Sequence, residues 1–218
     1  AATELEVRAS DLGLAFASDA RVYIPPCVAG FVGADHVAMI LASGIDQDER
    51  NVLGIDIGTN TEIVLSVHGR QQLIALSCAS GPAFEGAHIR SGMRAAAGAI
   101  ERVRLDENEP FIRTIGNVPP VGICGSGIID VVAELRRVGA INARGRFQAE
   151  APRVQRGRYG LEYLLVPSAE TSSGEEITIT QHDVSEIQLA KAAIMAGITV
   201  LLQVGELQAE DLDEIIIA

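Results

Sequence analysis

Runs of apolar positions, some continuous and some alternating with polar residues, divide the chain into short strands and a few helices. The clearest group is three strands in quick succession, at 52–57, 61–67 and 71–79. Short turns containing glycine join them, and such connections are typical of antiparallel pairing. We therefore predict a three-strand antiparallel meander, with helices before and after it.

Four helices are predicted around this meander. The first occupies 33–43, and the second begins at Pro82, which suits a first helical turn, and runs to about Ala95. The third covers 128–135. In the fourth, Asp183 and Glu186 form a capping box, and Gly205 ends the helix. Further strands are expected at 21–24, 97–105, 111–115, 161–166, 177–180 and 213–217, the last of them buried, and 139–176 is expected to be an irregular insertion.

The composition indicates a folded domain. Hydrophobic residues make up 48% of the 218 residues and the mean hydropathy is +0.24, which excludes disorder. No apolar run is expected to reach membrane-spanning length, so we predict a cytoplasmic protein without a membrane partner. The net charge of −12 disfavours a nucleic-acid partner, because it repels a phosphate backbone.

The cysteines and histidines show no metal-ligand spacing. Cys27, Cys78 and Cys124 are far apart in sequence, and no Cys-x-x-Cys pair exists, so this chain alone is not expected to build a zinc or iron–sulfur site. We interpret Cys78 and Cys124 as reduced, buried packing residues rather than redox groups.

Both ends suggest a fragment. The chain opens on Ala-Ala, and it stops inside the apolar run Ile215–Ala218, whereas a strand is normally followed by the turn that leaves the sheet. We therefore expect parts of the protein to lie outside this sequence.

The turn after the first meander strand is a candidate phosphate site. Asp56 could hold a Mg²⁺ ion through its waters, and Gly58, Thr59 and Asn60 could present backbone and side-chain donors to phosphate oxygens. An ordinary hairpin is the alternative, since tight turns also need Gly and Asn.

A second candidate anion site is the loop Gly125-Ser126-Gly127, which leads directly into a helix. The first N–H groups of a helix have no partner within it and attract anions. The alternative is that Ser126 is an N-cap and that the glycines only permit the bend. Glu85 could lie near the same ligand or simply favour its own helix dipole, and Arg94 and Arg102 are taken as solvated or packing residues.

The order of elements resembles half of the actin, sugar-kinase and heat-shock-chaperone ATPase superfamily. The implied fold class is α/β, a ribonuclease H-like lobe with a mixed sheet, an antiparallel meander and flanking helices. In this resemblance residues 1–218 are the second lobe of the ATPase region, together with the 33–43 helix that connects the two lobes. Asp56–Asn60 is the second phosphate loop of the fold, and the first is expected in the other lobe. The motifs narrow the match to the C-terminal region of the reductive activators of corrinoid proteins; they lie at 31–35, 56–62, 81–87, 92–95, 98–101 and 122–127.

The resemblance implies a function. Family members use ATP and Mg²⁺ to drive an electron from a two-iron two-sulfur domain, absent from this chain, onto the Co(II) corrinoid of a methyltransferase system, which becomes Co(I). It implies Asp56 as the catalytic and magnesium-holding residue, a corrinoid protein as partner, and leaves a homodimer open. A kinase or hydrolase of the same superfamily and a non-catalytic docking module are the alternatives.

Overall fold

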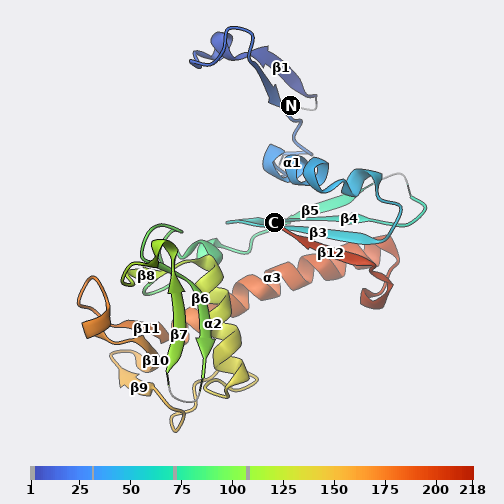
Figure 1. Ribbon diagram of the computed structural model, residues 1–218. Helices are drawn as coiled ribbons and strands as arrows, with labels where there is room; N and C mark the ends of the chain where they lie inside the picture. The colour runs from blue at the N-terminus through green and yellow to red at the C-terminus, as the bar shows by residue number, and fades with distance from the viewer. Residues whose placement is uncertain (1–2, 31, 71–72, 107–108) are drawn as a thin grey trace. The chain divides into compact units, whose positions relative to one another are not determined.

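A four-stranded sheet is the centre of the first of two structural units in the computed structural model (Figure 1). The structure describes residues 3–30, 32–70, 73–106 and 109–218. The sheet has the order β12-β3-β4-β5, with β12 parallel to β3 and the other pairs antiparallel. The predicted meander is therefore confirmed. The meander strands are β3 (Val52–Ile57), β4 (Thr61–Ser66) and β5 (Ile74–Cys78), and β12 (Glu214–Ile217) completes the sheet.

One helix packs on each face of this sheet (Figure 1). On one face, Ile40 of α1 (Ala34–Ser43) and Ile45 form a small core with Val52 and Val64. On the other face lies the second half of α3 (Gln181–Gly205). A Cβ atom added at Gly197 would be 2.3 Å from Sγ of Cys78, so glycine there permits close packing.

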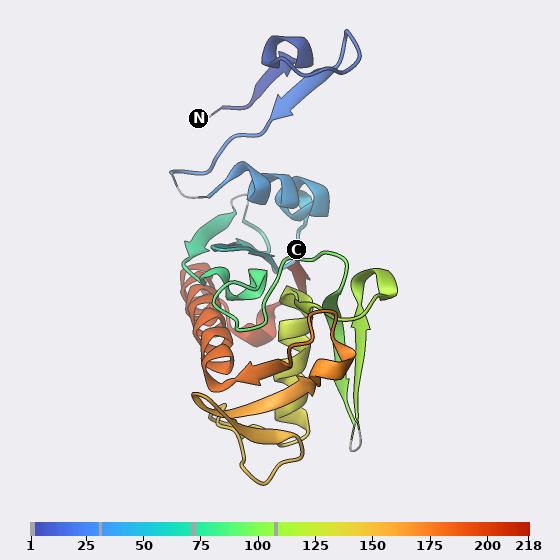
Figure 2. The same cartoon turned by 90° about the vertical axis from the view of Figure 1, so that its left-hand side faces the viewer.

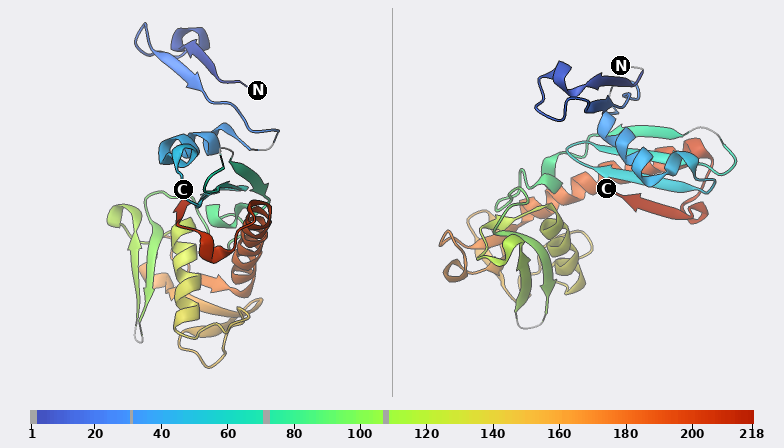
Figure 3. Two further views of the ribbon diagram at one scale, coloured as in Figure 1. Left: turned by 90° about the vertical axis from the view of Figure 1, so that its right-hand side faces the viewer. Right: turned by 45° about the horizontal axis from the view of Figure 1, so that its top comes forward.

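The predicted helix at 33–43 is confirmed, and it ends at Gly44, which has a left-handed φ of 72°. The first unit also contains a hairpin of β1 (Leu5–Arg8) and β2 (Arg21–Ile24), which are antiparallel. Figure 3 shows this hairpin as a separate two-stranded ribbon. Phe31, the first residue of one family motif, lies outside the described residues, as do 71–72 at the expected start of the third meander strand.

The second unit has its own core around α2 (Gly125–Arg137). This helix packs along the β7-β6-β8 sheet, where β6 pairs antiparallel with β7 and parallel with β8 (Figure 2). Ile128, Val131 and Leu135 are buried on the helix face that meets the sheet. The three strands are β6 (Ala99–Leu105), β7 (Pro110–Thr114) and β8 (Gly122–Ile123).

The stretch expected to be irregular contains regular structure. Within 139–176 the chain forms β9 (Val154–Gly157) and β10 (Gly160–Val166), and β10 also pairs with β11 (Ile177–Thr180) (Figure 3). β9 was not predicted because the arginines and glycines around it resemble a loop, whereas its partner β10 confirms the strand expected at 161–166. The inward residues Tyr163 and Leu165 of β10 are buried in the core of the second unit.

The prediction of a helix from Pro82 to Ala95 is wrong. Only the short 3-10 helix η3 (Pro82–Glu85) forms, and Gly86 ends it with a left-handed φ of 85°. The following chain lies against β8 instead: Gly92 bridges to Ile123, and the Met93 N–H donates to the Ile123 carbonyl. A Cβ atom at Gly92 would lie 1.9 Å from the Gly86 carbonyl oxygen, so this path requires glycine.

Two details at the ends of α3 and β12 also differ from expectation. The capping box is formed by Thr180 and Asp183, not by Asp183 and Glu186. The Thr180 N–H donates to Oδ2 of Asp183, and the Asp183 N–H donates to the Thr180 hydroxyl. β12, expected to be buried, exposes Ile215 and Ile217 because it is the edge strand of its sheet.

The predicted fourth helix and its end at Gly205 are confirmed as α3, but its apolar character was underestimated. Its 25 residues include an 18-residue window with a mean hydropathy of 1.7, which meets the length and composition of a membrane span. The expectation that no apolar stretch reaches this length was therefore wrong. A long helix that packs in a core has the same composition, and Ile187, Ala190 and Leu201 of α3 are buried.

Candidate functional site

Asp56 lies at the carboxyl end of β3, on the face of the sheet that carries α1. It is directly opposite Glu62 on β4, and Glu62 is opposite Ser77 on β5. Residues paired in this way project to the same face. The Ser77 hydroxyl donates to Oε1 of Glu62 at 2.9 Å, while 25% of the Asp56 side chain is exposed. The strands therefore present a polar row that ends in an accessible carboxylate.

A buried histidine stands behind this carboxylate. His36, in the first turn of α1, is 0% exposed, and its Nδ1 atom lies 3.7 Å from Oδ2 of Asp56. Neither ring nitrogen has a hydrogen-bond partner among the described residues. Burial lowers the pKa of His36, and the nearby Asp56 carboxylate only partly opposes this shift. The imidazole is therefore neutral at pH 7, with one donor and one acceptor unused.

His36 was missed by the sequence analysis as a site residue. The only available signal was its place directly after Gly33-Ala34-Asp35 at the start of the predicted connector helix. A histidine in an apolar helix more often packs than binds. Its contact with Asp56 depends on how α1 crosses the sheet, which the sequence does not specify.

A single carboxylate of this kind fits a Mg²⁺ ion held through water. Mg²⁺ keeps several of its waters and needs only one or two protein carboxylates when phosphates supply other ligands. Among the described residues, no group of three or more His, Cys, Asp or Glu side chains is placed to hold a metal directly. Asp56, with its orphaned buried neighbour His36, is thus the residue that suits a hydrated ion.

The turn after β3 belongs to the second unit and is tied to Glu85. Thr59 and Asn60 are exposed, and the Gly58 N–H donates to the Asn60 carbonyl at 3.1 Å. The Thr59 hydroxyl donates to Oε1 of Glu85 at 2.5 Å. Thr59 and Glu85, both selected from the sequence, therefore meet, and the hydroxyl of Thr59 is engaged by protein.

Glu85 also lines a cavity of about 500 Å³ together with Gly125 and Ser126. The other lining residues include Arg94, an exposed guanidinium that the sequence analysis treated as solvated. This cavity brings the first residues of α2 and the Glu85 carboxylate together within the second unit. The two separately predicted anion-binding stretches, 58–60 and 125–127, are thus linked through Glu85.

Ser126 is not the N-cap of α2, so the alternative role considered for it is wrong. Cys124 is the N-cap residue and makes no capping bond with its side chain, while the Ser126 hydroxyl donates to the Glu101 carbonyl at 2.9 Å. A Cβ atom at Gly125 would lie 1.9 Å from the Phe84 carbonyl oxygen, and one at Gly127 2.2 Å from that of Ile100. Both glycines permit close packing, and the first N–H groups of α2 lack helical partners.

The buried cysteines fit the packing interpretation. Cys78 and Cys124 are 7% and 3% exposed, and burial raises the pKa of the Cys78 thiol. The Cys124 thiol donates to the Ile100 carbonyl. Cys27, in contrast, is exposed.

Comparison with known proteins gives consistent matches. Residues 50–218 match the family described as the C-terminal domain of RACo, the ASKHA domain, and residues 1–48 match the RACo middle region. The corrinoid activation enzyme RamQ of Eubacterium limosum is 37% identical over 98% of this chain and 37% of its own length. The [Co(II) methylated amine-specific corrinoid protein] reductase of Methanosarcina barkeri is 29% identical over 92% of this chain.

A solved structure gives the same result. The reductive activator for corrinoid, iron–sulfur protein superposes with a TM-score of 0.86 and 40% sequence identity, covering 97% of this chain and 34% of that one. The actin-like ATPase fold predicted from the sequence is therefore confirmed. The chain spans only about a third of the length of the relatives that it matches.

Proposed function

Since the chain belongs to the family of reductive activators of corrinoid proteins, we propose that it forms the second lobe of an ATP-dependent activator. The complete protein would return the Co(II) corrinoid of a methyltransferase system to Co(I). One electron would pass to cobalt from a two-iron two-sulfur cluster outside this chain, which is thereby oxidised by one electron. Hydrolysis of ATP to ADP and phosphate would supply the driving force.

The observation that carries this proposal is the placement of Asp56. Asp56 is the second-last residue of the first meander strand, its side chain is partly exposed, and the turn with the exposed residues Thr59 and Asn60 follows after Ile57. Bound Mg²⁺ would neutralise charge on the terminal phosphates of the nucleotide. Asp56 would orient the waters of that ion, and neutral His36 would limit the orientations open to the carboxylate.

The remaining predicted residues have supporting roles in this proposal. The N–H groups of Thr59 and Asn60 and the Asn60 amide would donate to phosphate oxygens. The start of α2, at Gly125–Gly127, would present N–H groups to an anion beside Arg94. Thr59 would act mainly through its backbone, because its hydroxyl is bonded to Glu85.

The test uses the full-length protein with its corrinoid protein under reducing, oxygen-free conditions. ATP-dependent appearance of Co(I) is followed by absorbance, and ATP hydrolysis is measured in parallel. We expect Asp56→Asn to slow both by about 100-fold or more, because it removes the charge that orients the ion. Asp46→Asn changes an exposed aspartate of the same unit and should leave both rates unchanged. Normal Co(I) formation by Asp56→Asn would remove Asp56 from the mechanism.

A further inference from the structure

The cationic residues of this acidic protein are unevenly distributed. The whole chain has 17 Lys and Arg residues against 29 Asp and Glu residues. Between 142 and 158, however, the sequence contains five arginines and only one acidic residue, Glu150. A segment with this balance creates a local positive field on an otherwise negative protein.

Most of these arginines are free to meet a partner. Arg153 has a structural role, because its guanidinium donates hydrogen bonds to the Leu164 and Leu165 carbonyls. The other four have exposed side chains, and none makes an ion pair within the part of the chain that the structure describes. We call these four the arginine patch: Arg144, Arg146, Arg156 and Arg158.

Arg158 and Tyr159 form the two-residue turn between β9 and β10. Tyr159 is 81% exposed, and the guanidinium carbon of Arg158 lies 5.1 Å from the centre of its ring. A cation held over an aromatic ring at the tip of a hairpin is partly ordered before any partner arrives. Tyr and Arg are also the residues that most often dominate binding energy at protein interfaces.

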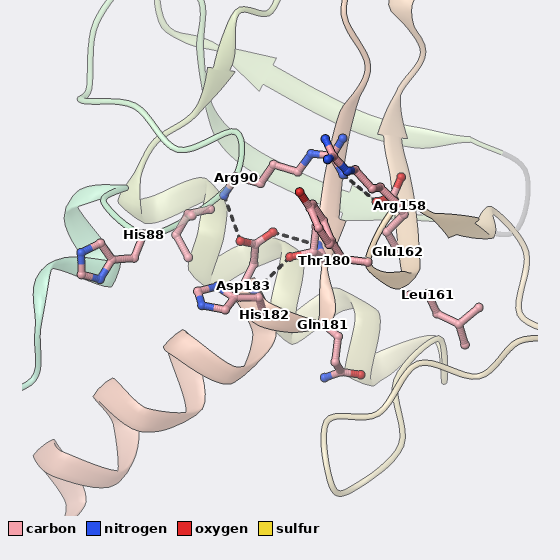
Figure 4. Close-up of a pocket in the computed structure, with 12 residues that line it drawn as sticks. His88, Arg90, Arg158, Leu161, Glu162, Thr180, Gln181, His182 and Asp183 are labelled. Carbon is pink, nitrogen blue, oxygen red and sulfur yellow. Dashed lines mark hydrogen bonds and ion pairs between the residues drawn. The ribbon is translucent and has the colours of Figure 1, made fainter.

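The hairpin tip borders a cavity of the second unit with a volume of about 680 Å³ (Figure 4). The acidic groups of this cavity already have partners other than Arg158. Asp183 accepts hydrogen bonds from the Arg90 and Thr180 N–H groups, and Glu162 forms a 2.7 Å ion pair with Arg90. The cationic side chain of Arg158 is left without an anionic partner among the described residues.

The loop that carries Arg144 and Arg146 is hydrogen-bonded to a residue of the same cavity. Gln181, a lining residue, donates from Nε2 to the Gly145 carbonyl and accepts at Oε1 from the Phe147 N–H. Arg144 and Arg146 therefore flank the cavity wall. His88 and His182, which also line the cavity, each lie 3.7 Å from Glu186.

We propose that the arginine patch and the adjoining cavity are a docking surface for an acidic segment of a protein partner. A carboxylate of that segment would pair with Arg158 in the cavity, and neighbouring acidic residues would pair with the rest of the patch. The identity of the partner rests on the proposed function: it would be an acidic face of the corrinoid protein. The surface itself follows from the charges and contacts of this chain alone.

The test compares charge reversals in the full-length protein. Arg156→Glu combined with Arg158→Glu changes the patch, and Arg102→Glu combined with Arg136→Glu is the matched control, since both arginines are exposed and lack ion pairs among the described residues. Affinity for the corrinoid protein is measured at low and high salt. The patch variant should bind at least about tenfold more weakly and show a shallower salt dependence, whereas the control should stay within about twofold. Equal loss in both variants, or no loss in either, would refute the proposal.

Two further measurements separate this surface from the proposed function. ATP hydrolysis without partner should be unchanged in the patch variant, because the patch is not part of the Asp56 site. Poly-L-glutamate serves as a probe that needs no corrinoid protein, and it should bind the wild type and lose affinity only in the patch variant. Should the protein fail to produce Co(I), the poly-L-glutamate result still decides the surface. Preference for poly(U) RNA over poly-L-glutamate, or poly-L-glutamate binding that survives the reversal, would contradict the proposal.

Discussion

Nδ1 of His36 lies 3.7 Å from Oδ2 of Asp56, although the imidazole is completely buried and neither of its nitrogens has a hydrogen-bond partner among the described residues. A buried polar group without a partner costs stability, by about 1 to 3 kcal/mol. Other contacts in the fold must offset this cost. The position of His36 beside the proposed catalytic carboxylate indicates that its value is functional.

Replacement of His36 by leucine should therefore separate stability from activity. Leucine has a similar volume and no polar atoms, so we expect His36→Leu to keep or raise the free energy of unfolding, by up to about 1 kcal/mol. Urea denaturation measures this change. In the same variant, ATP-dependent Co(I) formation by the full-length protein should fall, because Asp56 loses its neighbour. A loss of more than about 2 kcal/mol in stability would show instead that the imidazole is a packing residue.

The pH dependence of stability should carry the signature of His36. Burial lowers the pKa of His36 in the folded protein, so the unfolded chain, with a pKa of about 6.5, binds the proton more readily. Stability is then fully present above about pH 6.5 and falls as the pH drops towards the lowered pKa. Denaturation midpoints measured between about pH 7 and pH 5 should decline more in the wild type than in His36→Leu. Parallel declines in the two proteins would contradict the assigned protonation state.

A second carboxylate supports the core of the second unit. Glu134, 7% exposed, accepts hydrogen bonds from Arg137 and from the Leu105 N–H, and these contacts, chiefly that with Arg137, lower its pKa to about 2. Glu134→Gln should cost about 1 to 2 kcal/mol at pH 7, because the amide loses the charge-assisted bond. The exposed Glu150→Gln is the control.

The effect of Glu134 should fade in acid. A lowered carboxyl pKa gives stability that is present above the unfolded value, about 4.3, and is lost as the pH falls through about 2. Wild type and Glu134→Gln should therefore converge in stability at low pH. A difference that is constant from neutral pH to about pH 3 would mean that packing, rather than charge, accounts for the loss.

Much of the fold could be predicted because local signals and tertiary packing agree. The meander from Val52 to Cys78 and the α1 helix ending at Gly44 follow from apolar spacing and turn residues. The failures are places where long-range packing decides. Pro82 and Glu85 suit a helix, but Gly92 and Met93 pair with β8, which no local pattern reveals.

The candidate site divides in the same way. Asp56 and the glycine turn could be found because strand, turn and strand are contiguous in sequence. His36 and Arg94 could not. His36 lies near Asp56 because α1 packs on the sheet, and Arg94 lines the same cavity as Gly125 because of the path of 86–95. The strand β10, with its buried Tyr163 and Leu165, could be predicted, but β9 could not, because the arginines and glycines around it resemble a loop.

A close contact on the other face of the first sheet gives a last prediction. In a helix interior, alanine is normally more favourable for stability than glycine by about 1 kcal/mol. At Gly197 of α3, however, an added Cβ atom would lie 2.3 Å from Sγ of Cys78, so Gly197→Ala should destabilise the protein by about 1 to 3 kcal/mol despite the better helix former. Cys78→Ala removes the obstructing sulfur. In a double-mutant cycle measured by urea denaturation, Gly197→Ala should cost much less in the Cys78→Ala background than in the wild type. Equal costs in the two backgrounds would show that the sulfur does not limit the approach of α3 to the sheet.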